Sequence, residues 1–317
     1  MAKTSAAQGK ANAGSLKDRI ADLVLRGLIG GLGLVPYAAR VNLMGWVMRR
    51  VLGPLAGYRA RAQTNLARIY PDMPAPDRAR IATQALDNFG RTLIENYSGP
   101  ELAARLADTQ PQGAGVAALA EAVAAKRPVI FVTGHIGNYE APRHVLTRMG
   151  YSIGGIYRAM GNPWFNAHYV TTLEQVSGPV FERGRGTPGF VRHLRGGGLA
   201  AILFDVHDTN GEPLPFLGEA AMTSTSAADL ALRYKADVIP YFGIRRPNGL
   251  DFDIHVEAPI PHGTPDEMMA AMTARLEAHI ARTPGQWFWV HRRWKPQKAR
   301  RQKLAQERAG TTPPPQP

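Results

Sequence analysis

The sequence contains no cysteine in 317 residues. This absence excludes disulfide bonds, thiolate nucleophiles and metal sites with cysteine ligands. Long apolar runs are missing as well. The main one, over residues 27–39, is shorter than the roughly twenty residues that a spanning helix needs, and Pro36 interrupts it. No small-residue cleavage site follows it, so we do not expect a signal peptide.

Acidic residues are scarce relative to basic ones. The 25 Asp and Glu residues stand against 38 Lys and Arg residues, which makes the formal net charge +13. A charge of this size indicates an acidic partner, which is nucleic acid, anionic lipid or an acidic protein. The hydrophobic share of 44% and the charged share of 20% are typical of a globular protein. At this length the chain can bury one large core or two smaller ones.

Several catalytic and metal-binding motifs are absent. The sequence has no H-E-x-x-H, no G-x-S-x-G and no Walker loop. His207 with Asp205 and Asp208 is an incomplete set of metal ligands, so we expect no metal.

A glycine-rich G-x-G-x-x-G motif occupies residues 184–189. Its following helix is short and the unit is not the first strand–helix pair, so we expect no dinucleotide cofactor. A simpler interpretation is a turn that presents Arg183 and Arg185 to an acidic ligand.

A histidine lies where a strand passes into a helix. Apolar and β-branched residues 129–133 predict a buried strand, and helical composition begins at Glu140. Between them, His135 precedes a carboxylate by five residues, which suits a general base and its orienting partner. Such a pair diverges on a regular helix at about 100° per residue, so His135 must lie on the loop; Gly134 and Gly137 permit the bend. The alternative is a loop histidine beside an acid stabilised by the helix dipole.

Predicted strands and helices alternate along most of the chain. The predicted strands are 129–133, 151–157, 179–181, 199–204, 238–244 and 252–256. The predicted helices are 61–71, 77–97, 113–126, 140–146, 163–176, 188–194, 224–235 and 265–283. This alternation predicts an α/β fold with a mixed, mostly parallel central sheet flanked by helices. Ligands bind at the carboxyl ends of strands in such sheets, where His135 is expected.

The two ends of the chain differ from this α/β domain, which we assign to residues 58–295. Residues 1–57 combine a disordered start with an apolar, arginine-flanked helical segment. That segment is either a membrane-associated helical region or an ordinary pair of core helices. Residues 287–295 mix tryptophans with arginines, which suits a membrane interface, a polyanion groove or an aromatic anchor in the core. Residues 296–317 are a basic and then proline-rich tail that we expect to be disordered.

Several sequence boxes together resemble one known family. Residues 134–140, Gly-His-Ile-Gly-Asn-Tyr-Glu, look like the H-x4-(D/E) box of the lysophospholipid acyltransferase superfamily. They are most similar to its G-H-x-G-N-(W/Y)-E form in the lipid A biosynthesis (lauroyl/myristoyl) acyltransferases. The other matching boxes are Arg61-x3-Asn65-Leu66 with Pro71, Tyr157-Arg158-x3-Asn162-Pro163, Pro215-Phe216-Leu217-Gly218 with Thr223-Ser224-Thr225, and Trp289-x-His291-Arg292-Arg293-Trp294-Lys295. The resemblance covers roughly residues 15 to 300 in the right order.

The sequence departs from the family pattern at one box. Members often have D-Q-D after a buried strand, where this chain has Asp205-Val206-His207-Asp208. The E-G-T-R-like block of the glycerol-phosphate branch is absent, which argues against a plain glycerolipid enzyme.

The resemblance implies the late acylation of a lipid A precursor. An acyl chain passes from acyl carrier protein to the hydroxyl of a 3-hydroxyacyl chain on a phosphorylated glucosamine disaccharide. His135 is then the general base and Glu140 fixes its tautomer, with no cofactor and no acyl-enzyme. Arg158 is the candidate for the oxyanion or a phosphate, with a structural salt bridge as the alternative. The two acids of the divergent box are candidates for binding sugar or orienting Arg158, with capping of the next turn as the alternative. The implied substrate-binding residues are Gly137, Asn138, Arg158, Asn162, Arg185, Asp205 and Asp208.

The implied partners are acyl carrier protein, the lipid A precursor and an anionic membrane, with no nucleic acid. The implied location is the bacterial inner membrane, with the active site on its cytoplasmic face. Two alternatives stay open. One is a related acyltransferase for another glycolipid or a lysophospholipid, and the other is a non-enzymatic, basic peripheral membrane protein.

Overall fold

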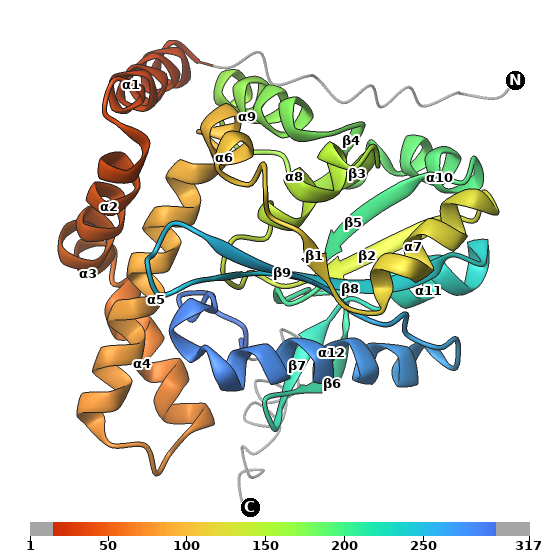
Figure 1. Cartoon of the computed structure of the whole chain (residues 1–317). Helices are drawn as coiled ribbons and strands as arrows, with labels where there is room; N and C mark the ends of the chain where they lie inside the picture. The colour runs from red at the N-terminus through yellow and green to blue at the C-terminus, as the bar shows by residue number, and fades with distance from the viewer. Residues whose placement is uncertain (1–14, 296–317) are drawn as a thin grey trace, which may run out of the picture.

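The computed structural model describes residues 15–295 of the chain. Within this range the strands form a seven-stranded sheet in the order β1-β9-β8-β2-β5-β3-β4 and a separate hairpin, β6-β7 (Figure 1). Strands β8, β2, β5, β3 and β4 run parallel to one another, while β9 is antiparallel to β8. The prediction of a mixed, mostly parallel sheet flanked by helices is confirmed.

The predicted elements lie within a few residues of the observed ones. The strands of the large sheet are Pro111–Gln112 (β1), Val129–Thr133 (β2), Ile153–Tyr157 (β3), Val180–Glu182 (β4), Leu199–Leu203 (β5), Asp237–Arg245 (β8) and Phe252–Val256 (β9). The helices from residue 99 onward are Gly99–Arg105 (α6), Gly115–Ala124 (α7), Ala141–Arg148 (α8), Pro163–Val176 (α9), Thr187–Arg195 (α10), Ser226–Tyr234 (α11), Pro265–Arg282 (α12) and the 3-10 turn Pro284–Gln286 (η2). Strand β1 and the hairpin, Glu212–Phe216 (β6) and Glu219–Thr223 (β7), were not predicted.

The sheet has a hydrophobic core on each face, because successive side chains of a strand point to opposite sides. Val129 and Phe131 of β2 pack in a cluster with Val145 of α8. Ile130 and Val132 pack in a second cluster, to which α10, α11 and α12 contribute. Both faces of β2 are therefore covered, and all of its residues are buried.

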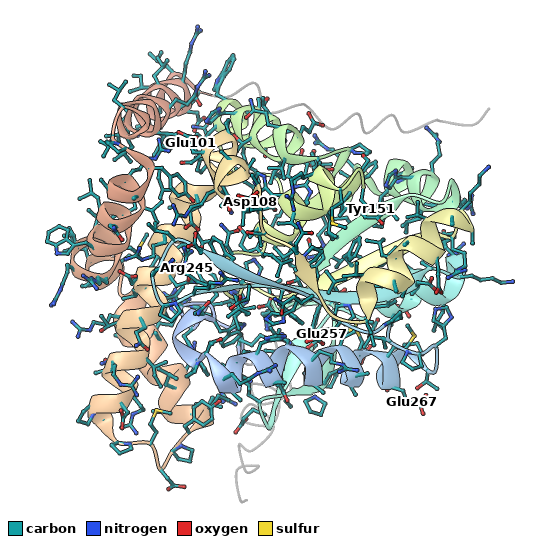
Figure 2. The ribbon with its side chains drawn as sticks, in the orientation of Figure 1. Glu101, Asp108, Tyr151, Arg245, Glu257 and Glu267 are labelled. Atoms are coloured by element: carbon teal, nitrogen blue, oxygen red, sulfur yellow. The ribbon has the colours of Figure 1, made fainter. Side chains whose placement is uncertain are left out.

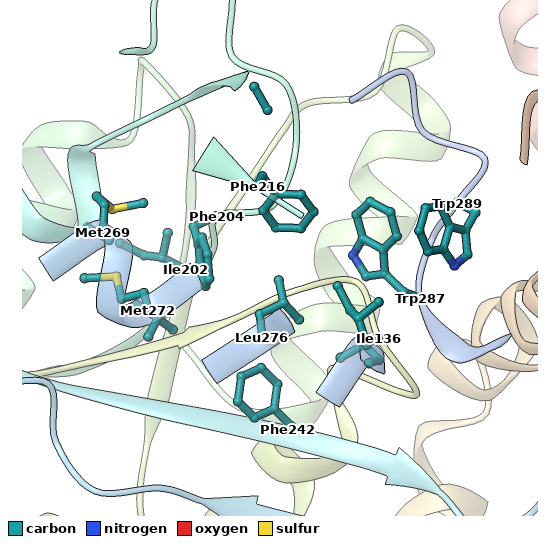
Figure 3. Close-up of a cluster of buried hydrophobic side chains, with 14 of the residues drawn as sticks. Ile136, Ile202, Phe204, Phe216, Phe242, Met269, Met272, Leu276, Trp287 and Trp289 are labelled. Atoms are coloured by element: carbon teal, nitrogen blue, oxygen red, sulfur yellow. The ribbon is translucent and has the colours of Figure 1, made fainter. Parts of the chain in front are cut away.

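The aromatic segment after η2 belongs to the second core. Trp287, Trp289 and Trp294 are at most 8% exposed, and Arg293 is fully buried. Figure 3 shows Trp287 between Phe216 of the hairpin and Trp289. A membrane interface formed by these tryptophan rings is thus wrong, and the alternative of an aromatic core anchor is confirmed. The basic and proline-rich tail lies outside the described residues.

The N-terminal helices form a layer at one edge of the sheet (Figure 1). They are Leu16–Gly33 (α1), Tyr37–Val47 (α2), the π-helical turn Met48–Leu52 (η1), Gly53–Leu55 (α3), Tyr58–Ile69 (α4) and Ala75–Asn96 (α5). Helices α2 and α4 pack on α5, while α1 lies against α9. Among residues 15–295, no helix has the length and apolar character needed to cross a membrane.

Candidate active site

The loop after β2 places His135 at the carboxyl end of the sheet, as predicted. Its side chain is 26% exposed. The bend uses both expected glycines. Gly137 has a φ of +55°, and a Cβ there would overlap the carbonyl oxygen of Gly243. A Cβ on Gly134 would lie 2.6 Å from the Leu276 side chain and 2.9 Å from Oδ2 of Asp205. The loop can therefore pack closely only with glycine at these positions.

The His135 ring is oriented by Asp205. Its Nδ1 lies 2.7 Å from Oδ1 of Asp205, and its backbone N–H donates to Oδ2 at 2.8 Å. Asp205 follows β5, which is the parallel neighbour of β2, so the two strand ends bring these residues together. Trp287 Nε1–H also donates to Oδ2 at 2.9 Å. Because a carboxylate only accepts, Nδ1 carries a proton and Nε2 is the ring nitrogen left for the cavity.

The environment keeps Asp205 ionised. Burial by itself raises the pKa of this carboxyl, since the residue is only 2% exposed. The charge of His135 and the hydrogen bonds from His135 and Trp287 outweigh burial and lower the pKa to about 2.

Glu140 does not make the predicted contact with His135. Its Oε2 accepts from Nη1 of Arg143 at 2.9 Å, and its backbone N–H donates to Oδ1 of Asn138. Arg143 is itself buried, and its Nε donates to the carbonyl oxygen of Ile153. Glu140 occupies the N-cap position of α8, where a partner three residues later is closer than the loop histidine. Asp205, predicted as a sugar-binding residue, takes the orienting position instead.

Gly137 and Asn138 support the loop from behind. Asn138 is fully buried, and its Nδ2 donates to Oε2 of Glu95 at 2.9 Å. The carbonyl oxygen of Gly137 accepts from Asn88 and Thr92 of α5. Neither residue is in the predicted substrate-binding position, because both form hydrogen bonds to side chains of α5.

A buried ion pair completes this support. Arg245 of β8, labelled in Figure 2, donates from Nη2 to Oε2 of Glu95 at 2.8 Å. It also donates to Asn88 and Thr92, the two residues that hold Gly137. Glu95 is fully buried and fully paired, as a buried charge must be. Helix α5 therefore fixes the loop that presents His135.

The remaining predicted substrate-binding residues are separated in space. Asn162 caps α9 and donates from Nδ2 to the carbonyl oxygen of Asp18 at 2.7 Å, which ties α1 to α9. Arg158 is exposed on the cavity wall, and Arg185 is exposed away from it. Asp208 lines the cavity and pairs with Arg183 at 2.6 Å. The suggestion that Asp205 or Asp208 orients Arg158 is therefore wrong.

A cavity of about 720 Å³ opens beside His135. Its apolar wall comes from β3, β4, β5, α9, α10 and α11, and includes Ile156, Phe181, Phe190, Phe204 and Leu230. Its polar lining residues include His135, Glu140, Arg158, Asp208 and His291. The arrangement suits a ligand with a long apolar part whose reacting group lies beside an imidazole.

Comparison with known proteins identifies the family. Residues 15–296 match the family model described as bacterial lipid A biosynthesis acyltransferase. The chain belongs to this family. It is 24% identical over 268 residues to a lipid A biosynthesis acyltransferase of Haemophilus influenzae, a match that covers 82% of each chain. It is 23% identical over 238 residues to a lipid A biosynthesis lauroyltransferase of Escherichia coli, which covers 73% of this chain and 77% of the relative.

Membership assigns this chain to the acyltransferases of lipid A biosynthesis, with a lipid A-type acceptor. The suspected family is confirmed. Several boxes that carried the resemblance have structural positions in this lipid A acyltransferase. Asn65 donates from Nδ2 to the carbonyl oxygens of Trp289 and His291, at 2.7 and 2.8 Å. Arg61 donates to the carbonyl oxygen of Val290. The first box therefore holds the last one in place.

Sequence reasoning assigned no chemical role to Trp287, His291 or Arg293 of this acyltransferase. Arg293 is buried and donates to the carbonyl oxygens of Val206 and Met222, which holds the loop after Asp205. The density of tryptophan and arginine in residues 287–295 was a visible signal. The sequence left a membrane interface, a polyanion groove and a core anchor open, because composition does not show which way these side chains point.

Proposed function

We propose that this acyltransferase moves a fatty acyl chain from acyl carrier protein to a hydroxyl of a lipid A precursor, with His135 as general base and Asp205 as its orienting residue. The observation behind this proposal is the His135–Asp205 pair beside a largely apolar cavity of about 720 Å³. A base with a fixed tautomer and an apolar space for an acyl chain are the two requirements of the reaction.

The chemistry needs no covalent enzyme intermediate. Nε2 of His135 takes the hydroxyl proton while the hydroxyl oxygen bonds to the carbonyl carbon of the thioester. The tetrahedral intermediate then breaks its C–S bond, and the departing thiolate takes the proton from His135. The products are the new ester and the free carrier thiol. Asp205 stabilises the imidazolium between these steps and holds Nε2 toward the cavity.

The charged groups at the cavity have separate tasks in this proposal. Arg158 is exposed on the wall and makes no ion pair within residues 15–295, so it is available to a phosphate of the acceptor. The net charge of +13 favours both an acidic carrier protein and an anionic lipid surface.

Helix α1 supports a position on the membrane surface, because it turns its apolar side outward. Leu16, Leu23 and Leu28 are 75%, 62% and 60% exposed, while Asp22 is the buried residue of the helix. Its polar side faces α9, where Arg19 lies over the ring of Trp164. An outward apolar face with arginine beside it is typical of a helix that lies in the headgroup region of an anionic membrane. We propose that this membrane is the bacterial inner membrane and that the active site lies on its cytoplasmic face.

The test combines purified enzyme with a deletion strain. Full-length protein is incubated with lauroyl-acyl carrier protein and a 3-hydroxyacylated, phosphorylated glucosamine disaccharide, and the products are weighed by mass spectrometry. We expect the acceptor to gain one acyl ester, and His135→Ala to lose on the order of 10²–10⁴-fold in rate or more. Lipid A from the deletion strain should lack one acyl chain. Absence of transfer with an unchanged lipid A profile would contradict the proposal and direct attention to another acceptor.

A further inference from the structure

His291 shares the wall of the cavity with His135. The ring of Phe288 contacts both imidazoles, with centroids 5.7 Å from that of His135 and 6.4 Å from that of His291. The two histidines therefore face the same reaction space, although they are far apart in the sequence. The mechanism above uses only His135.

The tautomer of His291 is fixed by the backbone. The N–H of His207 donates to Nε2 of His291 at 2.8 Å. A backbone N–H can only donate, so this nitrogen has no proton, and a neutral ring must hold its proton on Nδ1. Burial lowers the pKa of His291 to about 4, although Asp205 opposes this shift. The ring is thus a neutral donor at pH 7.

The position of His291 is held from several sides. Its carbonyl oxygen accepts from Asn65, and its N–H donates to the carbonyl oxygen of Phe288 at 3.1 Å. The next residue but one, Arg293, is fully buried. Within residues 15–295, Nδ1 of His291 makes no hydrogen bond, so a rigid ring presents one unused N–H.

We propose that Nδ1–H of His291 donates a hydrogen bond to the carbonyl oxygen of the thioester during attack. This oxygen gains negative charge as the hydroxyl bonds to the carbonyl carbon, and it returns to a carbonyl when the C–S bond breaks. A fixed donor stabilises that charge without giving up its proton. His291 is no second base, because its only lone-pair nitrogen is occupied by His207. The inference rests on the proposed acyl transfer.

Two substitutions separate this role from a purely structural one. In His291→Asn the amide nitrogen can take the place of Nδ1, but the acceptor for the His207 N–H is lost. In His291→Gln the amide oxygen can take the place of Nε2 and accept from His207, but the Nδ1 donor is lost. A catalytic donor makes H291Q the worse enzyme, whereas a structural role makes H291N the worse enzyme.

The experiment measures kcat, KM and Tm for wild type, H291N and H291Q, with lauroyl-acyl carrier protein and the acceptor named above. We expect H291Q to lose on the order of 10²–10³-fold in kcat with little change in KM. H291N should stay within about tenfold of wild type in kcat and have the lower Tm. Wild-type kcat in H291Q, or equal losses in both variants, would overturn the inference.

Two further outcomes are also decisive. Should H291Q not fold, a kcat of H291N within about tenfold of wild type supports the donor, and a loss of about 10² or more contradicts it. Failure of the wild type to transfer any acyl chain concerns the proposed function instead, so the two failures are distinguishable.

Discussion

At the scale of single residues, three donors converge on one carboxylate. Asp205 accepts from Nδ1 and the backbone N–H of His135 and from Nε1 of Trp287. This sharing fixes three things at once, namely the imidazole tautomer, the loop that carries His135 and the aromatic segment behind it. A carboxylate has lone pairs for all three donors, whereas an amide has one oxygen and adds two donors of its own.

Asp205→Asn should therefore inactivate the enzyme without unfolding it. The amide oxygen cannot accept from all three donors. Either the His135 tautomer is lost, or an N–H of the asparagine faces an N–H of His135 or Trp287. We expect kcat to fall by about 10⁴-fold, comparable to the loss when the orienting acid of a serine protease is neutralised. Steady-state kinetics and Tm measured on the same preparation check this.

Glu140→Gln serves as the comparison for that variant. It removes the charge that neutralises buried Arg143, and breaking a buried pair costs roughly 3–5 kcal/mol. We expect mainly a lower Tm, with a smaller fall in kcat of the folded protein than in Asp205→Asn. If Glu140→Gln lost activity as severely at unchanged Tm, Glu140 and not Asp205 would be the orienting group.

At the scale of elements, α4 and the segment 287–295 act as one unit. Asn65 makes two hydrogen bonds to that segment, and they join parts of the chain more than two hundred residues apart. The aromatic rings of the segment pack under the hairpin and against the Asp205 loop. This contact makes the C-terminal segment part of the active-site wall.

Removing the hydrogen bonds between Asn65 and the segment 287–295 should destabilise the protein. Asn65→Ala deletes two hydrogen bonds of about 1 kcal/mol each and leaves two partly buried carbonyl oxygens with fewer donors. We expect the free energy of unfolding to fall by about 2 kcal/mol, measured by urea denaturation. The neighbouring Thr64→Ala, which loses only a bond to Ala60 within the helix, is the control and should change stability by less than about 0.5 kcal/mol.

Helix α1 leads to a different prediction. No other part of the described structure buries its apolar side chains. Replacing Leu23 and Leu28 with glutamine should lower binding to vesicles of anionic phospholipid by roughly tenfold or more, since each buried leucine contributes about 1.5–3 kcal/mol. Co-sedimentation measures this. Val123→Gln, an exposed apolar residue on α7 at the other end of the sheet, is the control (Figure 1). Equal binding by all three proteins would contradict a membrane role for α1.

At the scale of the whole molecule, buried titratable groups set how stability depends on pH. Burial lowers the pKa of His144 to about 4, from a usual value of 6.5. Between these values the unfolded chain binds a proton that the folded chain does not. The free energy of unfolding therefore falls as pH drops from about 6.5 to 4. Asp205 acts in a lower window, since its stabilising contribution is lost only as pH falls from 3.8 toward 2.

Urea denaturation at several pH values checks this prediction. His144 contributes a loss of up to about 3 kcal/mol between pH 6.5 and 4. His144→Gln should make that part of the curve less steep, because glutamine does not titrate, while His291 still contributes to the slope. An unchanged slope in this variant would show that other groups are responsible.

Most of the strands and helices were already determined by local sequence. Strand β2 and helix α9 appear where the local sequence predicts a strand at 129–133 and a helix at 163–176. The glycines of the loop predicted the bend at His135 for the same local reason. The series of boxes also predicted the family, since each box is a short stretch whose letters can be compared directly.

Only the tertiary structure decided which groups meet. The partner of His135 is 70 residues away along the chain, and it is brought there by the pairing of β2 with β5. Glu140 is closer in sequence but lies on a helix that directs it to Arg143. Sequence alone also could not decide how the segment 287–295 and helix α1 are oriented. Composition shows that a stretch is amphipathic but not which side the fold buries. Local chemistry therefore determined the elements of this acyltransferase, and long-range packing decided its catalytic pair.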